Sequence, residues 1–301
     1  MTAPRIVACL WFDQNAAEGV RLYTEVLPDA RAVATSYYSD AHDNAGGVAR
    51  GKELTVAFEA GGCAFTTLNG GPHFKPNPSV SFFVEVASAD LVNRIAERLL
   101  EGGQTMMPLA AYPWSDRYGW VTDRFGFGWQ LMVPRGPFDR AAIAPCLMFS
   151  GEQHGRAEEA MRTYAEIFPA SGVQSLVRYE PGEGPTDAVK HGRVTLAGRT
   201  FVAMDSHLSH GVTFNEATSF QVMCRDQAEV DRYWAALSQG GAESRCGWLK
   251  DRFGLSWQIV PVDMPRWMTG GDRAARDRAF QAMLTMKKLD IAAMEKAFRG
   301  E

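Results

Sequence analysis

The sequence predicts an α+β protein built from two copies of one unit, each copy consisting of two βαβββ modules. A nine-residue motif, DRFGFGWQL at 123–131, returns as DRFGLSWQI at 251–259. Other motifs recur in the same order, namely CLWF at 9–12 with CLMF at 146–149, and LYTEVLP at 22–28 with TYAEIFP at 163–169. Within each copy, short apolar runs and helical stripes follow the order strand, helix and three strands, twice over.

The first helix of each copy is predicted from apolar residues at helical spacing. The stripes consist of Ala16, Val20, Tyr23 and Leu27, and of Ala157, Met161, Tyr164 and Phe168. Each helix should end before a proline, Pro28 or Pro169, because proline cannot continue the hydrogen-bond ladder. We expect the two stripe tyrosines to be buried with their hydroxyl groups paired.

The remaining elements follow from caps, turns and β-rich runs. Ser88 and Asp226 are suitable N-caps for the second helix of each copy. β-rich runs in the first copy lie at 31–38, 52–59, 62–68, 79–86, 117–122 and 127–133. DRFG then forms the turn between the last two strands of each copy, and its Asp and Arg are expected to be structural.

The repeat predicts one domain at 1–136 and a second at 140–264, followed by a C-terminal helix within 270–301. The apolar face of this helix is expected to pack on its own domain or on a second subunit, so a homodimer fits the pattern. It consists of Phe280, Met283, Leu284, Ile291, Met294 and Phe298.

Composition narrows the class of protein. The net charge of −4 over 301 residues gives no reason to expect nucleic acid or an anionic membrane as partner. The five cysteines are scattered and never form a C-x-x-C pair, which favours a reducing compartment. No run approaches the roughly 20 apolar residues of a membrane span, and no signal peptide precedes the first strand. We therefore expect a cytoplasmic protein.

The tandem motifs, together with SFFVEV at 81–86, resemble the vicinal-oxygen-chelate superfamily of glyoxalase I, bleomycin-resistance proteins and extradiol dioxygenases. WLKDRFGLSWQIVP at 248–261 and MKKLDIAAME at 286–295 are similar to its PhnB-like branch, whose members often carry the label 3-demethylubiquinone-9 3-methyltransferase. The resemblance implies tandem glyoxalase-like domains in which each pair of modules curls into a cup. Metal-dependent members place His and Glu ligands on the inward face of that cup.

Carried over to this chain, the ligand positions fall on neutral residues. They are Ala8, Ser81 and Gln130 in the first copy, and Pro145, Ser219 and Gln258 in the second. Because three or four charged or imidazole ligands are needed for zinc or iron, this resemblance implies cups without a metal. The glutamine amides could then bind a polar ligand or satisfy neighbouring backbone groups. Side chains alternate along a strand, so Trp129, Trp257, Cys9 and Cys146 are expected to face the helices.

Three further segments are candidates for a site. His207 and His210 lie three apart in a loop, where they could bind a metal or simply be solvated. The Gly-rich loops at 39–47 and 180–192 could lie over the rim of a cup. The apolar segment 106–114 has no counterpart in the second copy, and we expect it to cover a domain interface, with the mouth of the first cup as the alternative.

From these patterns we predict a small-molecule-binding protein that uses no cofactor and holds an aromatic or amphipathic ligand in a cup. The alternative is a lyase, isomerase or dioxygenase that binds a divalent metal through His207, His210 and a nearby carboxylate. A third possibility is a scaffold that serves oligomer assembly. Methyltransferase activity is not supported, because the chain has no G-x-G-x-x-G loop between a strand and a helix.

Overall fold

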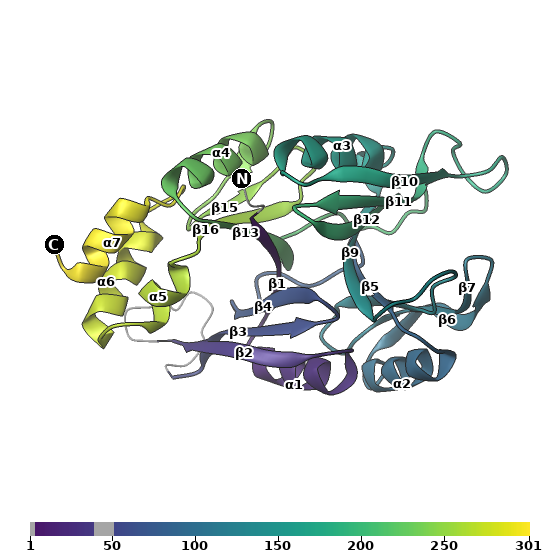
Figure 1. Cartoon of the computed structure of the whole chain (residues 1–301), viewed down its shortest axis with the longest axis horizontal. Coiled ribbons are helices and arrows are strands. Elements are labelled where there is room, and N and C mark those ends of the chain that lie inside the picture. Colours follow the sequence, from purple (N-terminus) through teal and green to yellow (C-terminus); the bar gives the residue numbers. More distant parts are fainter. Residues whose placement is uncertain (1–3, 39–50) are drawn as a thin grey trace.

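The computed structural model describes residues 4–38 and 51–301, which form four βαβββ modules followed by a helical C-terminal segment (Figure 1). The first repeat contains β1 Arg5–Phe12, α1 Ala16–Val26, β2 Arg31–Tyr37, β3 Glu53–Ala60, β4 Cys63–Asn69, β5 Val80–Glu85, α2 Ala89–Leu99, β6 Gln104–Tyr112, β7 Ser115–Thr122 and β8 Gly128–Met132. The second contains β9 Ala142–Phe149, α3 Ala157–Ile167, β10 Gly172–Arg178, β11 Val189–Leu196, β12 Arg199–Asp205, β13 Thr218–Cys224, α4 Gln227–Ser238, β14 Ala242–Glu243, β15 Trp248–Lys250 and β16 Ser256–Pro261. The predicted α+β fold with two modules per sheet is confirmed.

The strands form two eight-stranded mixed sheets, and each sheet takes one module from each repeat. Sheet A has the order β14-β15-β16-β13-β1-β4-β3-β2, and sheet B the order β10-β11-β12-β9-β5-β8-β7-β6. The two halves of sheet A meet where β1 pairs with β13, and those of sheet B where β5 pairs with β9, both antiparallel. The repeats therefore exchange modules, and neither forms a sheet by itself.

The helices stay with their own repeats. Helices α1 and α2 lie together at the bottom of Figure 1, and α3 and α4 lie together at the top. Each helix covers one face of its sheet, with α1 and α4 on sheet A and α2 and α3 on sheet B. The main hydrophobic core lies under these helices and continues from one repeat into the other.

The DRFG motif explains how two modules of one repeat are joined. Asp123 is buried in the turn between β7 and β8, where its Oδ1 accepts hydrogen bonds from the backbone N–H groups of Phe125 and Phe127. Its Oδ2 accepts from the Tyr23 hydroxyl at 2.7 Å and from the Trp129 indole at 2.8 Å. Because Tyr23 belongs to α1 and the turn to the second module, one carboxylate links the two modules.

The second repeat contains the same arrangement. Asp251 accepts hydrogen bonds from the Tyr164 hydroxyl at 2.6 Å and from the Trp257 indole at 2.8 Å. Both tyrosines are buried and paired, and both tryptophans face the helices, so these expectations are confirmed. The tryptophan of the motif recurs in both copies because its indole is one of the donors to the buried carboxylate.

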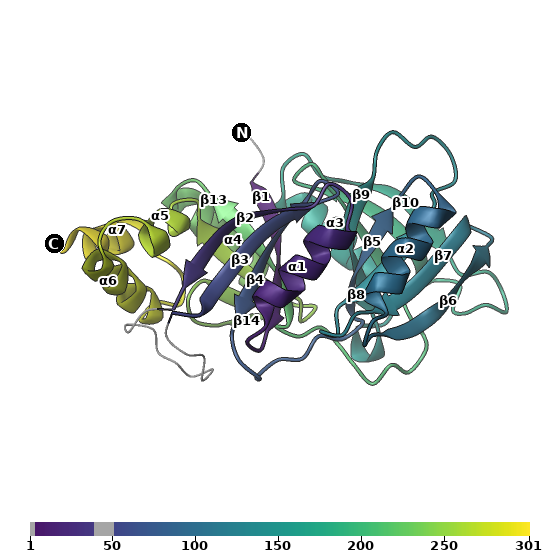
Figure 2. The same cartoon turned by 90° about the horizontal axis from the view of Figure 1, so that it is seen from below.

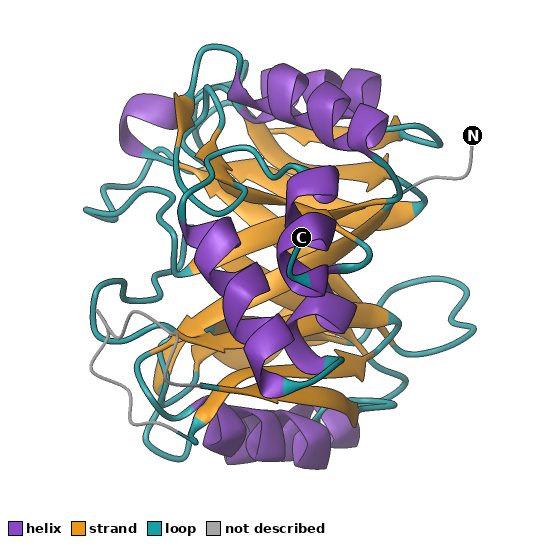
Figure 3. Cartoon of the chain, turned by 90° about the vertical axis from the view of Figure 1, so that its left-hand side faces the viewer, coloured by secondary structure: helices purple, strands orange, loops and turns teal. Residues whose placement is uncertain are grey.

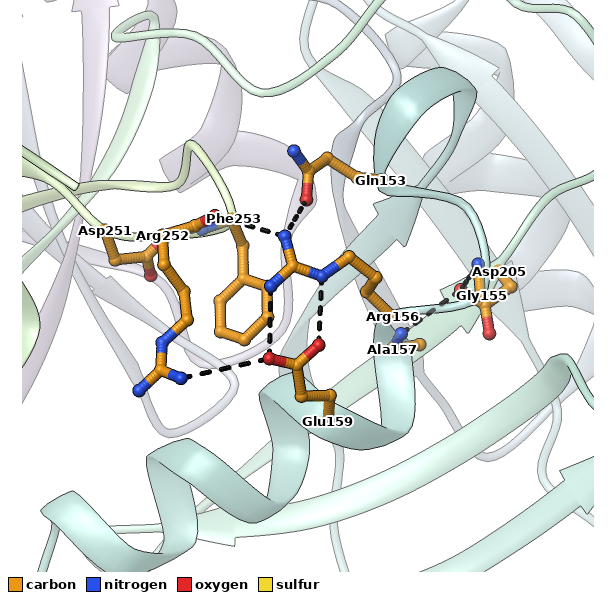
Figure 4. Close-up of polar contacts among 9 residues, drawn as sticks. All are labelled: Gln153, Gly155, Arg156, Ala157, Glu159, Asp205, Asp251, Arg252 and Phe253. Carbon is orange, nitrogen blue, oxygen red and sulfur yellow. Dashed lines mark hydrogen bonds and ion pairs between the residues drawn. The ribbon is translucent and has the colours of Figure 1, made fainter. Parts of the chain in front are cut away.

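Arg156, just before α3, makes a second set of contacts between this helix and the DRFG turn of the same repeat (Figure 4). Its guanidinium donates to both oxygens of Glu159, to the Gln153 side chain and to the carbonyl oxygen of Arg252. It also lies over the ring of Phe253, with its Cζ atom 4.5 Å from the ring centroid. Arg156 thus fixes the start of α3 against the DRFG turn.

The predicted C-terminal helix is divided in the structure. Short α5 Met264–Thr269 precedes α6 Arg273–Leu284 and α7 Ile291–Arg299. Between α6 and α7 the carbonyl oxygens of Met286 and Lys287 accept hydrogen bonds from Cys246 and Gly247, so they are not used in a helix. Asp290 then caps α7 by accepting from the Ala293 N–H. Trp267, Ala279 and Met294 form a small core of this segment.

A helix that spans a membrane must be both long and apolar. Among the described residues, no helix is both long enough and apolar enough to span a bilayer.

Replacement of Tyr23 or Tyr164 by alanine should lower the free energy of unfolding by about 3–5 kcal/mol, as for other large-to-small core changes. Phenylalanine at the same position removes only the donor to the buried carboxylate and should cost about 1–3 kcal/mol. Urea denaturation of the variants measures both values. An alanine variant that loses less than about 1 kcal/mol would place these side chains at the surface.

Stability should fall as the pH rises above about 10. Burial and the neighbouring aspartate charges raise the pKa of Tyr23 and Tyr164 well above 10. The unfolded chain therefore loses these phenolic protons at a lower pH than the native protein, and the stabilisation present below pH 10 is lost above it. Denaturation at pH 9 to 11 should show a shallower fall in the double Tyr-to-Phe variant. Equal slopes in both proteins would contradict the assignment.

Candidate functional site

Strand register determines which side chains face away from the helices. In sheet B, Ser81 lies opposite Cys146, and the Gln130 amide donates to the Ser81 hydroxyl at 2.9 Å. In sheet A, Ser219 lies opposite Cys9, and the Gln258 amide donates to the Ser219 hydroxyl at 2.9 Å. We call these the cup faces of the two sheets. The structure therefore brings Ser81 together with Gln130, and Ser219 together with Gln258.

The placement of the first-strand residues was wrong by one position. Ala8 lies opposite Phe220 and Pro145 opposite Phe82, on the helix side of the sheets. Cys9 and Cys146, which we expected to face the helices, instead point to the cup faces. A shift of one residue along a strand turns every side chain to the other face, so the apolar run CLWF did not reveal its orientation.

We call the Gln, Ser and Cys side chains that lie together on each cup face its floor, and all three groups are neutral. Burial raises the pKa of the Cys9 thiol to about 11 and that of Cys146 to about 12, against hydrogen bonds from the neighbouring Gln and Ser that lower it. At neutral pH each floor therefore offers an amide, a hydroxyl and a protonated thiol. Such a set does not fit zinc or iron, which need thiolate, imidazole or carboxylate ligands.

The two histidines lie away from both floors. His207 is exposed in the loop after β12, with its ring against Tyr179 at a centroid distance of 5.3 Å. The Nε2 atom of His210 lies 2.7 Å from the Ser206 hydroxyl. Within residues 4–38 and 51–301, no three His, Cys, Asp or Glu side chains gather as a metal site would require. The residues present do not support the metal-dependent alternative.

The cup face of sheet B is closed by its own side chains. The Tyr118 hydroxyl donates to the Gln130 amide oxygen at 2.7 Å, so both groups of that amide are engaged. Phe83, Tyr118, Trp120, Met148 and Val202 are all buried in one cluster.

The segment 106–114 lies at the edge of this cup. It contributes to edge strand β6, and the rings of Tyr112 and Trp114 stack beside Tyr118. Edge strand β6 pairs with β7 of its own repeat, and Met107 and Tyr112 pack against the cup-face cluster, which contains side chains of both repeats. The loop at 180–192 extends from sheet B, and the loop at 39–47 lies outside the described residues.

The cup face of sheet A is more open than that of sheet B at five equivalent positions. Its residues are partly exposed where those of sheet B are buried. The pairs are Trp11 with Met148, Thr66 with Val202, Gln221 with Phe83, Cys246 with Tyr118, and Trp248 with Trp120. Trp11 and Trp248 meet edge to face at 6.2 Å, and Phe74 lies 4.9 Å from Trp11. The three aromatic rings thus lie on the same cup face as the neutral polar groups of its floor.

A buried polar atom without a partner lies on each cup face. In sheet A this is the Ser256 hydroxyl, beside Ser219 and two residues from Gln258. In sheet B it is the indole N–H of Trp120. At the position of Ser256 the first repeat has Gly128, where a Cβ atom would lie 3.0 Å from Ser81 and 3.2 Å from the Trp120 nitrogen. The two floors therefore differ in shape as well as in polarity.

The C-terminal helices lie in front of sheet A and not sheet B (Figures 1 and 3). They are held at one end by the segment between α6 and α7, where Leu289 is buried and its carbonyl accepts from the Gln227 amide. Figure 2 shows the same helices beyond the ends of β2 and β3. The open cup face is therefore the one that the C-terminal segment screens.

Sequence reasoning missed Trp11, Trp248, Gln221 and Ser256. A signal for three of them was present, because the repeats differ at Trp11 and Met148, at Gln221 and Phe83, and at Ser256 and Gly128. At these three positions the two copies carry side chains of different size or polarity, and there the two cup faces diverge.

Comparison with solved structures shows which proteins have a similar fold. Glyoxalase I from Zea mays is 11% identical, covers 89% of this chain and 98% of its own, and has a TM-score of 0.56. A structure described as a putative 3-demethylubiquinone-9 3-methyltransferase, PhnB protein, from Bacillus cereus is 26% identical over 42% of this chain and 97% of its own, with a TM-score of 0.38. No curated protein matched.

A family model matches both repeats. The model described as 3-demethylubiquinone-9 3-methyltransferase matches residues 4–132 and again residues 141–260, once in each repeat. The chain belongs to this family, and its fold is that of glyoxalase I.

Proposed function

We propose that this protein binds a small molecule on the cup face of sheet A, without a metal ion. The observation that carries the proposal is the difference between the cups at equivalent positions. One face is filled by Phe83, Tyr118 and Trp120, whereas the other leaves Trp11, Gln221 and Trp248 partly exposed. Sheet B would then be a structural copy of the same scaffold.

The side chains of sheet A suggest the class of ligand. Trp11, Trp248 and Phe74 offer ring faces and edges for an aromatic or other apolar body. Among the residues that the structure describes, the Ser256 hydroxyl has no partner, and the Gln258 oxygen accepts a single hydrogen bond, of 3.1 Å, from Gln221. A buried hydroxyl without a partner is costly, so a ligand with an uncharged polar group would be stabilised there. We infer an aromatic or amphipathic ligand whose polar group is neutral.

The fold does not favour methyl transfer, despite the wording of the family description. Each sheet is mixed, and its helices lie on one face only, unlike the alternating parallel arrangement that binds nucleotides. We therefore propose binding, with no reaction assigned.

The site would be complete in one chain. Cys9 comes from the first repeat and Gln258 from the second, so the exchange of modules supplies both halves of the cup. A homodimer, which the sequence also allows, is not needed for binding.

The free cysteines are consistent with our proposal that the protein acts in the cytoplasm. The repeat boundaries at 136 and 140 also remain a proposal, since the sheets cross them.

Replacement of Gln258 by methionine should weaken binding of 2-naphthol, an aromatic probe with one neutral hydroxyl, by roughly fivefold to tenfold. Calorimetric titration of the wild-type chain should give one site. The matched control is Gln130→Met, which removes the equivalent amide from the closed cup. It should leave the affinity for the probe unchanged. If Gln130→Met abolished binding and Gln258→Met did not, the functional cup would be the one on sheet B.

Replacement of Gln258 or Gln130 by glutamate should not create a tight zinc site. The change adds one charged oxygen, but the nearby cysteine thiol stays protonated because its pKa is about 11 or about 12. Competition with a chromogenic chelator measures the affinity for zinc, and elemental analysis of the wild-type protein is the control. About one tightly bound zinc per chain in either protein would show that other ligands contribute.

A further inference from the structure

The geometry points to a second binding site, between the two repeats, for a small monocarboxylate with a short apolar tail. A cavity of about 190 Å³ lies where the turn between β3 and β4 meets the turn between β11 and β12. Residues from both repeats line it, together with Arg140 from the linker between β8 and β9. It shares no lining residue with the set named above for the cup face of sheet A.

The deep part of the cavity is apolar. Ile6, Ala8 and Phe201 line it, each no more than 2% exposed, together with Pro145. Ala8 and Pro145 are the two residues that the sequence placed in a cup and that the structure turns to the other face of their sheets. They therefore remain candidates for ligand contact, in this cavity instead.

The remainder of the lining is positively charged. Arg140, Arg193 and Arg199 line the cavity with one acidic residue, Glu85. Glu85 pairs with Arg193 at 2.8 Å, so these two charges offset each other. Arg199 donates to the carbonyl oxygen of Gly62 at 2.9 Å, a neutral partner. Arg140 has no hydrogen-bond or ion-pair partner among the residues that the structure describes. Two guanidinium groups are thus left without a counter-charge in a protein of net charge −4.

The size and polarity of the cavity together select the ligand. A volume of about 190 Å³ corresponds to roughly six water molecules at about 30 Å³ each, which is too small for a drug-sized ligand. A carboxylate is the anion whose two oxygens match a guanidinium group. An attached chain of a few carbons would fill the apolar end, which an inorganic anion would leave empty.

Such a ligand would stabilise the contact between the repeats. Gly62 and Glu85 belong to the first repeat, Arg193 and Arg199 to the second, and Arg140 to the linker. Because the site does not exist in the unfolded chain, binding should raise the melting temperature in a saturable manner.

The test is calorimetric titration of the intact protein with sodium butyrate, formate, octanoate and phosphate at constant ionic strength. We expect saturable binding of butyrate, and binding of formate that is roughly tenfold weaker or more, because formate has no tail to bury. Octanoate should also bind more weakly than butyrate because its chain exceeds the cavity. Equal affinity for butyrate, formate and phosphate would mean a non-selective positive surface and would overturn the proposal, as would the absence of saturable butyrate binding.

Variants of the linker give a matched comparison. Arg140→Gln should weaken butyrate binding roughly tenfold, since a charge-assisted hydrogen bond is lost. Arg135→Gln alters a nearby arginine that pairs with Asp116, outside the cavity, and should have no effect. Because Arg140 is exposed, its variant should fold, and its melting temperature without butyrate checks this. An unchanged affinity in Arg140→Gln would contradict the proposal.

A cup variant separates this site from the one on sheet A. Ser256→Val should weaken 2-naphthol binding and leave butyrate binding unchanged. Loss of butyrate binding in Ser256→Val would place butyrate in the cup and overturn the second site, while leaving the proposed function intact.

Discussion

The structure depends on a buried aspartate that occurs once in each repeat. Asp123 and Asp251 each accept four hydrogen bonds, from a tyrosine hydroxyl, an indole and two backbone N–H groups. Burial raises the pKa of both carboxyl groups, and these hydrogen bonds oppose that rise. The tyrosine comes from the helix of one module and the other donors from the last turn of the next. Removal of either partner would leave a polar group buried without compensation, which is why the whole DRFG motif recurs with so little change.

The same interaction orients the cup faces. The indole that reaches the aspartate must point to the helix side of its strand, and the next residue must then point to the opposite side. Gln130 and Gln258 are therefore held on the cup faces by their tryptophan neighbours. Each repeat keeps its own helices together in this way, while its two modules pair with those of the other repeat. Two cups with the same Gln, Ser and Cys groups result, and they diverge at Ser256 and Gly128 and in the side chains around these groups. In sheet B, Phe83 and Trp120 fill that space, whereas in sheet A it is partly open.

Much of this could be predicted from the sequence, because periodicity and repetition report local structure. The stripes that contain Tyr23 and Tyr164, the caps at Ser88 and Asp226, and the βαβββ order all follow from local patterns. The orientation of β1 did not, since CLWF is apolar on both faces of a buried strand and gives no alternation to read. The exchange of modules could not be predicted from the sequence either. The same residues are buried whether a module pairs with the other module of its own repeat or with a module of the other repeat. The break between α6 and α7 depends on hydrogen bonds to Cys246 and Gly247, about 40 residues away in the chain, and an apolar stripe does not contain that information.

The most direct test of this account is a double-mutant cycle between Tyr164 and Asp251. The four proteins are the wild type, Tyr164→Phe, Asp251→Asn and the double variant, compared by urea denaturation at neutral pH. If the hydroxyl and the carboxylate act as one buried unit, the two single losses should not add, and the coupling energy should be about 1–3 kcal/mol. Additive losses within about 0.3 kcal/mol would show that the two residues act independently, and would contradict the view that this aspartate fastens the two modules together.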